Sequence, residues 1–429
     1  MFIKFILNKP YKHIIRGEIN MSKVLGIIAE YNPFHNGHLL HLTKSKEETG
    51  AEYSICIMSG NFVQRGNTSI VNKWVKTEMA LKSGIDLVLE LPTVYSISSA
   101  ENFAEGAIKL LNSLKIVDTV SFGSENSDID ILNRFSGILY EEPKQYVEFL
   151  NEELKKGLSF PKARENAILL YLNDQKYSNI LNQPNNTLAI EYLKALKKYK
   201  SHIMPITIKR EKAFYNSNCI VDEYASATAI RNMIVNNQFN DIRKVMPRLA
   251  YDLLMQEIEN NQYVIDISKF EKEILYSIRR LSTADLKKFP EVNEGLENSI
   301  KNAANSCNTL AELINIIKTK RYTQTRIQRI LLYILLNITK KDMYISRKTV
   351  PYARILGYSQ KGKELISKIY NANPKITLIT SVKNFFDSSN NKTYKHMLSK
   401  DILATNIYTL AYKNNSVANL DYTKRIVTI

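Results

Sequence analysis

The sequence predicts an α/β protein, a doubly wound parallel sheet followed by a mostly helical, basic region. Between residues 23 and 125, short and nearly continuous apolar strands alternate with helix patterns, as in a parallel sheet covered on both faces. After about residue 240 the strand signal fades, and apolar residues recur at three-and-four spacing. At 429 residues the chain also exceeds the usual size of a single core, so two or more domains are expected.

The elements of the first half follow from these patterns in chain order. Strands are expected at 24–29, 53–58, 86–91 and 119–122 and, after a helical insertion at 141–200, at 204–209. Helices are expected from residue 37 and at 73–81, 100–114 and 225–235. Ligands of such sheets bind beyond the carboxyl ends of the strands, so functional residues are expected in the loops there.

The second half is interpreted as a helical domain at 241–429, behind a first domain at 21–240. Helices are expected at 244–259, 268–283, 297–317 and 323–337, and the part beyond residue 340 is harder to assign. Residues 1–20 lack the long apolar stretch and the cleavage site of a signal peptide. They are interpreted as an extension outside the fold, because Met21 directly precedes the first strand pattern.

The charge is concentrated in the last quarter of the chain. Formal net charge is +17, and residues 318–429 hold 21 Lys and Arg against 5 Asp and Glu. A basic region that also carries apolar and aromatic residues indicates a folded surface for a polyanionic partner, of which nucleic acid is the leading class. The alternatives are a solubility tail or the general Lys-rich bias of the chain.

Two other compositional features exclude classes of protein. No run approaches the roughly 20 apolar residues of a transmembrane helix, so no membrane association is expected. The three cysteines, Cys56, Cys219 and Cys307, are odd in number and widely spaced, which argues against disulfides and a zinc ribbon. A reducing, cytoplasmic location is expected, with each cysteine a small buried residue.

The most specific motif runs from Gly26 to His41, where a buried strand ends in a Pro-containing turn and a helix begins. Backbone N–H groups at a helix start form an anion site, and Gly37 lets a phosphate approach the backbone. His35 and His38 flank that glycine and suit donation to phosphate oxygens. One alternative is that His35, His38 and His41 are metal ligands, although no acidic or cysteine partner lies at a suitable spacing. The other is that they are surface polar residues at the start of an amphipathic helix.

A second motif starts the helix expected at 225–235. Ser226 and Thr228 suit capping and phosphate contacts, and Arg231 adds a fixed positive charge. Together the two motifs resemble the HxGH nucleotidyltransferase superfamily, whose late I-S-x-T-x-I-R signature matches this segment. The resemblance implies a Rossmann-like fold and catalytic roles for His35, His38, Ser226, Thr228 and Arg231.

Further segments narrow the resemblance. Residues 58–66, 86–92, 122–126, 183–186 and 318–323 are similar, in order, to the bacterial tRNA(Met) cytidine acetate ligase family. That family often has His where Asn61 stands, so Asn61 is given no catalytic role. The resemblance implies that acetate attacks the α-phosphate of ATP, and that the wobble cytidine of elongator tRNA(Met) then takes the acetyl group. Mg²⁺ is expected with the triphosphate.

The resemblance also implies the residues of the ATP site. They lie on the first loop, at the end of the fourth strand, before the helix after the insertion, and after the fifth strand: Ile28, Ala29, Glu30, Tyr31, Asn32, Pro33, Phe34, His35, Asn36, Gly37, His38, Leu39, Leu40, His41, Gly123, Asn185 and Arg210. For Asn185 a plain turn is the alternative.

The RNA contacts are expected at a basic stretch that opens the helix at 323–337. Its candidates are cations suited to phosphates and a tyrosine suited to stacking, namely Lys318, Lys320, Arg321, Tyr322, Arg326 and Arg329. A second basic segment, 357–364, nearly spells a P-loop. Glu364 replaces the required Ser or Thr and no buried strand is expected before it, so it is interpreted as a basic turn on the RNA-facing surface.

Two other functions fit parts of the sequence. A coenzyme or lipid-precursor nucleotidyltransferase would use the same two motifs on a small substrate, but needs no basic last quarter. A catalytically silent RNA-binding protein would have no reason to keep His35, His38, Ser226, Thr228 and Arg231 together.

Overall fold

The computed structural model describes residues 23–174, 177–178, 180–210, 223–414 and 417–429. The predicted extension at 1–20 and Cys219 lie outside the described residues. The other two cysteines, Cys56 and Cys307, are free and, as predicted, buried.

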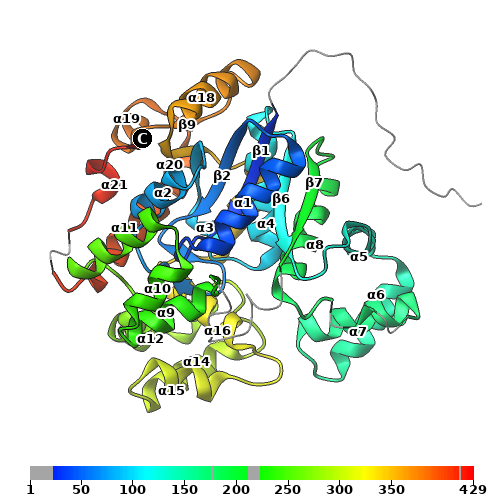
Figure 1. Cartoon of the computed structure of the whole chain (residues 1–429). Coiled ribbons are helices and arrows are strands. Elements are labelled where there is room, and N and C mark those ends of the chain that lie inside the picture. The colour runs from blue at the N-terminus through cyan, green and yellow to red at the C-terminus, as the bar shows by residue number, and fades with distance from the viewer. Residues whose placement is uncertain (1–22, 175–176, 179, 211–222, 415–416) are drawn as a thin grey trace, which may run out of the picture.

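One mixed sheet organises the molecule and confirms the predicted α/β class. Its order is β10-β8-β5-β2-β1-β6-β7, with β9 paired to β8, and β1 lies between β2 and β6 (Figure 1). The first five strands to form it are mutually parallel: β1 (Val24–Ala29), β2 (Tyr53–Ser59), β5 (Leu87–Leu91), β6 (Thr119–Ser124) and β7 (Met204–Lys209). These strands match the predicted ones closely.

Alternate residues of the strands feed two separate cores. On β2, Ile55 and Ile57 point into one core while Cys56 and Met58 point into the other. Both faces are therefore apolar, which explains why the strands read as continuous hydrophobic runs. The switch point of the sheet lies between β1 and β6. The chain adds β2 and β5 on one side of β1 before it crosses over and adds β6 and β7 on the other.

Helices cover both faces. Against one face pack α1 (Asn36–Thr49) and α2 (Lys73–Lys82), and against the other α4 (Ala100–Leu114) and α8 (Pro184–Lys198). Short elements complete this half: the β3–β4 hairpin (Phe62–Val63, Asn67–Thr68) and α3 (Thr93–Ser96). The predicted insertion at 141–200 contains α6 (Lys144–Lys155) and α7 (Phe160–Leu172), which with α5 (Ile129–Glu141) project to one side of the body (Figure 1). Its predicted end is too late, because α8 lies within these bounds and packs against the sheet.

The helices expected at 244–259, 268–283, 297–317 and 323–337 are present, the third of them divided at Cys307. The second half contains these and further helices, not all of them predicted. They are α9 (Ala227–Val235), α10 (Phe239–Val245), α11 (Arg248–Glu259), η3 (Ile267–Phe270), α12 (Glu271–Arg280), α13 (Thr283–Leu286), α14 (Leu296–Ser306), α15 (Leu310–Ile317), α16 (Gln324–Leu335), α17 (Lys340–Lys348), α18 (Gln360–Ala372), α19 (Val382–Ser388), α20 (Lys392–Tyr408), η4 (Thr409–Ala411) and α21 (Leu420–Thr423). Several of them, including α9 and α16, lie below the sheet in Figure 1.

The chain beyond residue 340 also returns to the sheet, which the sequence did not predict. It supplies β8 (Ala353–Tyr358), β9 (Leu378–Ile379) and β10 (Val427–Thr428), and β8 pairs antiparallel with β5. The region at 241–429 is thus not a purely helical body set apart from the sheet.

The interpretation of residues 357–364, the segment that resembles a P-loop, also needs a correction, because β8 was not predicted. A buried strand does precede it, because Gly357 lies in β8. Gly362, in α18, packs so closely that an added Cβ would lie 1.9 Å from the carbonyl oxygen of Asp86. Asp86 directly precedes β5, so the segment 357–364 lies at the amino end of that strand. Ligands of such sheets bind at the opposite, carboxyl edge.

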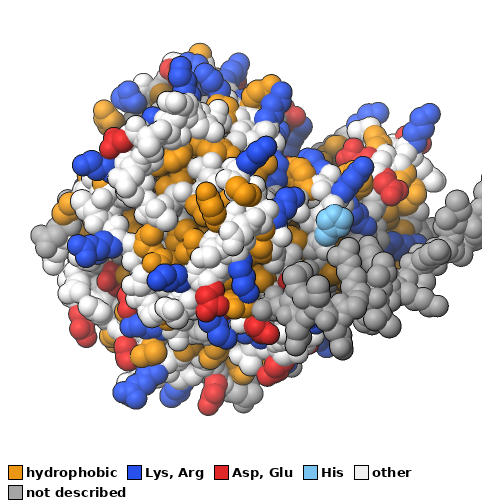
Figure 2. Space-filling model, turned by 90° about the horizontal axis from the view of Figure 1, so that it is seen from above, with side chains coloured by type: hydrophobic (Ala, Val, Ile, Leu, Met, Phe, Trp, Pro, Cys, Tyr) orange, Lys and Arg blue, Asp and Glu red, His pale blue; other side chains and the backbone are white. Residues whose placement is uncertain are grey.

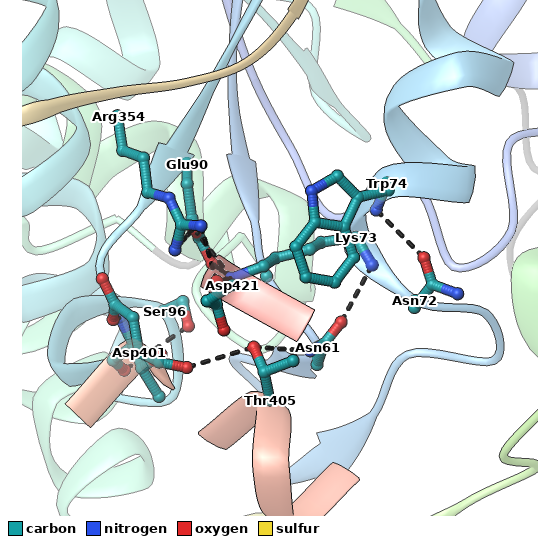
Figure 3. A network of polar contacts seen from close by, with 12 residues as sticks. Asn61, Asn72, Lys73, Trp74, Glu90, Ser96, Arg354, Asp401, Thr405 and Asp421 are labelled. Atoms are coloured by element: carbon teal, nitrogen blue, oxygen red, sulfur yellow. Dashed lines mark hydrogen bonds and ion pairs between the residues drawn. The ribbon is translucent and has the colours of Figure 1, made fainter. Parts of the chain in front are cut away.

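A buried group of charges fastens the last strands to the sheet (Figure 3). Lys73 donates to Glu90 at 2.8 Å and to Asp421 at 2.7 Å. Arg354 of β8 reaches the same two carboxylates, at 3.0 and 2.5 Å. We call Lys73, Glu90, Arg354 and Asp421 the charge cluster; it ties α2, β5, β8 and α21 together.

The face of the molecule seen in Figure 2 carries no single continuous basic patch among its described residues. Figure 2 shows one end of the molecule, where Lys and Arg side chains are spread widely with hydrophobic side chains between them. On this face, charge alone does not mark a surface for a polyanion. In the part of the chain that the structure describes, each helix is too short or too polar to cross a bilayer.

Candidate active site

A cavity of about 800 Å³ opens at the carboxyl ends of β1, β6 and β7. Ala29, Gly123 and Lys209 line it from these three strands. Its other walls come from the starts of α1, α8, α9 and α16 and from the β3–β4 hairpin. The cavity thus lies at the switch point, where the fold class predicts a ligand.

The loop after β1 is held rigidly. Tyr31 has a φ of 48°, in the left-handed region, and its ring is buried. The Asn32 side chain donates to the Thr68 carbonyl at 2.9 Å and accepts from the Ile70 backbone at 2.7 Å. These bonds fasten the loop to the hairpin before any ligand arrives.

A buried lysine supports the same loop from beneath. The Lys76 ammonium donates to the carbonyls of Glu30, Ser59 and Gly60, each at 2.8 Å. Burial lowers the pKa of Lys76 to about 7, while the three carbonyls match the three N–H groups of its charged form. Lys76 therefore joins the ends of β1 and β2.

The two histidines of the first motif cap α1. The His35 Nδ1 accepts from the Gly37 backbone at 3.1 Å, and the His38 Nδ1 accepts from the His35 backbone at 3.3 Å. A backbone N–H can only donate, so each Nδ1 is unprotonated and each neutral ring carries its proton on Nε2. The rings stack with centroids 3.8 Å apart and both line the cavity.

The imidazoles are neutral. Burial, with Arg210 and Arg231 nearby, lowers the pKa of His35 to about 3, and burial and Arg210 lower that of His41 to about 4. Burial, followed by His35 and Arg210, also puts the pKa of His38 well below its ordinary value. In this state His35 and His38 offer Nε2–H donors, while the positive charge of the cavity comes from arginine and lysine.

The second motif docks directly onto the first. Ser226 caps α9 by accepting from the Ala229 backbone at 3.1 Å. Arg231 donates to the Asn32 carbonyl at 2.8 Å and to the Thr228 hydroxyl at 3.1 Å. Ser226, Thr228 and Arg231 all line the cavity, although the two motifs are almost 190 residues apart in sequence.

The far wall holds the three remaining predicted residues. Gly123 lies under Arg210, and an added Cβ would approach that side chain to 3.0 Å. The Asn185 side chain donates to Glu125 at 2.7 Å, so its amide orientation is fixed at the start of α8. All three line the cavity.

Four residues of the predicted ATP set do not line the cavity. Pro33 and Phe34 turn into the core below the loop, and Asn36 and Leu39 fall on the other side of α1. Asn36 instead donates to the carbonyls of Glu223 and Lys244, at 2.9 and 3.1 Å. The helical repeat explains this, because residues 37, 38 and 41 share one face.

Other cavity residues were not predicted. The hairpin contributes Gln64, Arg65 and Asn67, and α16 contributes Gln324, Thr325 and Gln328. The signal for the hairpin was present, since residues 58–66 are one of the matched segments. Gly66, with a φ of 75°, explains the closeness of α16: an added Cβ would lie 2.6 Å from the backbone nitrogen of Arg329.

The predicted RNA residues divide into two groups. Arg329 binds Glu291 at 2.6 Å, Arg326 binds the Asn293 side chain at 2.8 Å, and Arg321 pairs with Glu294 at 2.7 Å. The Tyr322 ring is half-buried and lies 4.9 Å below the Arg326 guanidinium. Lys318 and Lys320 are exposed.

The acidic groups of the site are few. Glu30 is the one carboxylate that lines the cavity in the described part of the chain, and it accepts from the Gln64 backbone at 2.8 Å. Across the described ranges, no three His, Cys, Asp or Glu side chains are grouped so as to hold a metal.

Comparison with known proteins gives consistent results. Residues 22–422 match the HIGH nucleotidyl transferase family. The chain is 46% identical to the tRNA(Met) cytidine acetate ligase of Thermoanaerobacter sp. (strain X514), over 95% of this chain and 100% of that protein. It is 44% identical to the ligase of the same name from Clostridium perfringens (strain ATCC 13124), over 93% and 98%.

Solved structures agree. The apo crystal structure of Thermotoga maritima TmcAL superposes with a TM-score of 0.91 at 33% identity, over 95% of this chain and 100% of that one. The same protein bound with alpha-thio ATP gives a TM-score of 0.88, with the same identity and coverage.

Proposed function

This chain belongs to the tRNA(Met) cytidine acetate ligases, within the HIGH nucleotidyl transferase family, and from that premise we propose how its cavity works. It is an ATP-dependent ligase that activates acetate as acetyl-adenylate and passes the acetyl group to the wobble cytidine of elongator tRNA(Met). The product is N4-acetylcytidine. The observation that carries the assignment of the site is the bond from Arg231 to the Asn32 carbonyl, which joins both motifs around one cavity.

In the first step an acetate oxygen attacks the α-phosphorus of ATP, and the bond to the bridging oxygen of pyrophosphate breaks. No protein nucleophile is required, because acetate is already an anion. Negative charge grows on the departing pyrophosphate and on the α-phosphoryl oxygens. We assign its stabilisation to the Nε2–H groups of His35 and His38 and to Arg231, with Ser226 and Thr228 at the start of α9.

The neutral state of the histidines suits this role. Because each imidazole lies near arginine, a positive charge on the ring would be unfavourable until a phosphate is bound. Its Nε2–H is fixed in direction by the backbone bond to Nδ1, so the donor needs no reorientation as charge develops. The remaining lining residues of the predicted set, including Gly123, Asn185 and Arg210, hold the rest of ATP.

In the second step the exocyclic amine of cytidine attacks the acetyl carbonyl carbon, AMP leaves, and the amine loses a proton. The N4 nitrogen of cytidine is a weak base, so catalysis rests on bringing it close to the mixed anhydride. The loss of AMP needs the same phosphate contacts as the first step.

Mg²⁺ is expected to accompany the triphosphate. Glu30 is the carboxylate at hand, and it already accepts a backbone hydrogen bond. We therefore expect the ion to take most of its ligands from phosphate oxygens and water, as it does in many nucleotide sites. Its contribution would be to neutralise phosphate charge.

RNA binding is assigned to the basic part of residues 241–429, and catalysis to 21–240. The exposed Lys318 and Lys320 are the free cations of the predicted RNA stretch, because Arg321, Arg326 and Arg329 already have protein partners. A tRNA substrate also places the reaction in the cytoplasm.

The decisive experiment supplies the protein with ATP, Mg²⁺, radiolabelled acetate and total tRNA, and then locates the label. We expect label in the anticodon loop of elongator tRNA(Met), as N4-acetylcytidine. Acetate-dependent exchange of pyrophosphate into ATP, without RNA, measures the first step alone. Absence of label from RNA, together with pyrophosphate release on a small phosphorylated substrate, would overturn the ligase assignment in favour of a small-molecule nucleotidyltransferase.

A further inference from the structure

A second cavity lies beside the active site. It has a volume of about 360 Å³ and is enclosed by the start of α4, the loop before α14, and the helices α16 and α17. Ser99, Glu291, Tyr333, Lys340, Tyr344 and Arg347 are among its lining residues. The residues of either nucleotide motif do not reach it.

The two cavities share a thin wall. On α16, Gln328 faces the active site and Tyr333 faces the second cavity. Five helical residues span only about 7.5 Å along the axis. On the other side, the Gln64 side chain of the active site donates to the Ser98 carbonyl at 3.2 Å, and Ser99 lines the second cavity. The two cavities are therefore close neighbours, separated by α16 and by the residues around Ser98.

The wall itself is electrically neutral and fixed. Glu291, the carboxylate of the second cavity, binds Arg329 through two bonds of 2.9 and 2.6 Å and accepts from Tyr333 at 3.2 Å. Its φ of 62° lies in the left-handed region, which a glutamate adopts only when its surroundings enforce it. The carboxylate therefore leaves no net negative charge to repel an anion.

The outer side of the cavity is basic and aromatic. Arg347, Lys341 and Lys348 are exposed on α17, and none pairs with a carboxylate within the described residues. Tyr344, 59% exposed, presents its ring between them, with the Lys348 nitrogen 4.4 Å from the ring centre. Cations beside an exposed aromatic face are the chemistry that binds an unpaired nucleotide.

We propose that this second cavity holds an unpaired nucleotide of the RNA substrate that neighbours the reacting cytidine. Its base stacks on Tyr344, and its phosphates contact Arg347 and Lys348. The volume suits one base rather than a duplex, and the thin wall suits a residue close to the reacting one in sequence. The proposal rests on the proposed function, because it takes tRNA as the substrate.

The test separates binding from catalysis. Tyr344→Ala and Arg347→Ala change exposed side chains, so both variants are expected to fold. Binding of an elongator tRNA(Met) transcript is measured at several salt concentrations. Tyr344→Ala should weaken binding about tenfold with an unchanged salt dependence, whereas Tyr344→Phe should restore it. Arg347→Ala should weaken binding and lower the slope of log affinity against log salt by about 0.7 to 0.9.

A matched control is available on α12. Tyr276 is 67% exposed, with the Arg280 guanidinium 6.0 Å from its ring centre, and lines neither cavity. Tyr276→Ala should leave tRNA binding unchanged. Acetate-dependent pyrophosphate exchange should be within about twofold of wild type in all variants, since it needs no RNA.

Two results would overturn the inference. One is wild-type tRNA binding by both Tyr344→Ala and Arg347→Ala; the other is an equal loss of binding in Tyr276→Ala. Failure of the proposed function looks different: the wild-type protein itself would give no acetate-dependent exchange and no labelled RNA.

Discussion

The active-site cavity and the charge cluster both gather ionised side chains, but the cluster is buried whereas the cavity is open to a ligand. In the cluster, Lys73 and Arg354 face Glu90 and Asp421, two cations against two anions, all buried. Among the described residues that line the cavity, Arg65, Lys209, Arg210 and Arg231 are cationic and Glu30 is the one carboxylate. The cluster is closed to a ligand, whereas the cations that line the cavity are complementary to a polyanion such as ATP.

The pKa shifts follow the same division. In the cluster, burial opposes ionisation of Asp421, but Arg354 and Lys73 outweigh it and lower its pKa to about 2. In the cavity, burial and the arginines act together and lower the pKa of His35 to about 3. A perturbed pKa therefore does not by itself mark a functional site; the sign of the surrounding charge and access to a cavity decide.

The largest expected effect comes from breaking the balance of the cluster. Asp421→Ala leaves Lys73 and Arg354 buried with one carboxylate between them, so the free energy of unfolding should fall by about 3–5 kcal/mol. Urea denaturation of the purified protein measures it. The double variant Lys73→Met, Asp421→Leu removes one charge of each sign and should recover most of the loss. A loss under about 1 kcal/mol in the single variant would mean that the cluster does not hold the fold together.

Next in size is the removal of a donor from the cavity. His38→Ala should slow acetate-dependent pyrophosphate exchange by about 10²- to 10³-fold, as for the loss of one preorganised donor to a developing anion. Its tRNA binding should stay nearly intact, because the basic region is unaltered. His202→Ala, at an exposed histidine outside the cavity, is the control and should exchange normally. Joint loss of exchange and tRNA binding in His38→Ala would indicate a structural role for the loop.

The smallest effect is a difference in pH dependence. Folded His35 stays neutral, while the unfolded chain binds a proton below about pH 6.5, so stability is lost as pH falls from 6.5 towards 3. Each pH unit in that window costs about 1.4 kcal/mol. Between pH 7 and 5, wild type should lose roughly 2 kcal/mol more unfolding free energy than His35→Asn, which keeps a capping side chain. Parallel stability curves for the two proteins would contradict the neutral state of His35.

Much of the fold could be predicted because local patterns were strong. The strand at 24–29 and the helix at 100–114 match β1 and α4 residue for residue. Both are apolar on the faces that the sheet buries, so sequence and tertiary packing give the same answer. The return of the chain to the sheet could not be predicted, because β8 is a short run holding Arg354, which is buried only through Glu90 and Asp421. Its partners are distant in sequence.

The candidate site shows the same limit. The sequence motifs identified loops around one cavity, but not which side chains turn towards it. Asn36 and Leu39 were included because they lie within the motif, although the helical repeat turns them away. Gln328 was missed because its approach depends on Gly66, some 260 residues earlier, allowing close backbone contact. The catalytic roles themselves remain predictions that the variants above can test.

The position of Asp421 has a consequence for how the protein must be made. Both nucleotide motifs are synthesised before residue 232, yet the cluster closes only when Asp421 arrives, and β10 follows it. A ribosome that stalls or terminates before that point releases a chain with both nucleotide motifs, in which Lys73 and Arg354 have only the carboxylate of Glu90 between them. Such fragments should be substrates for cellular proteolysis. For the same reason, a purification tag next to β10 should disturb formation of the charge cluster more than a tag ahead of β1.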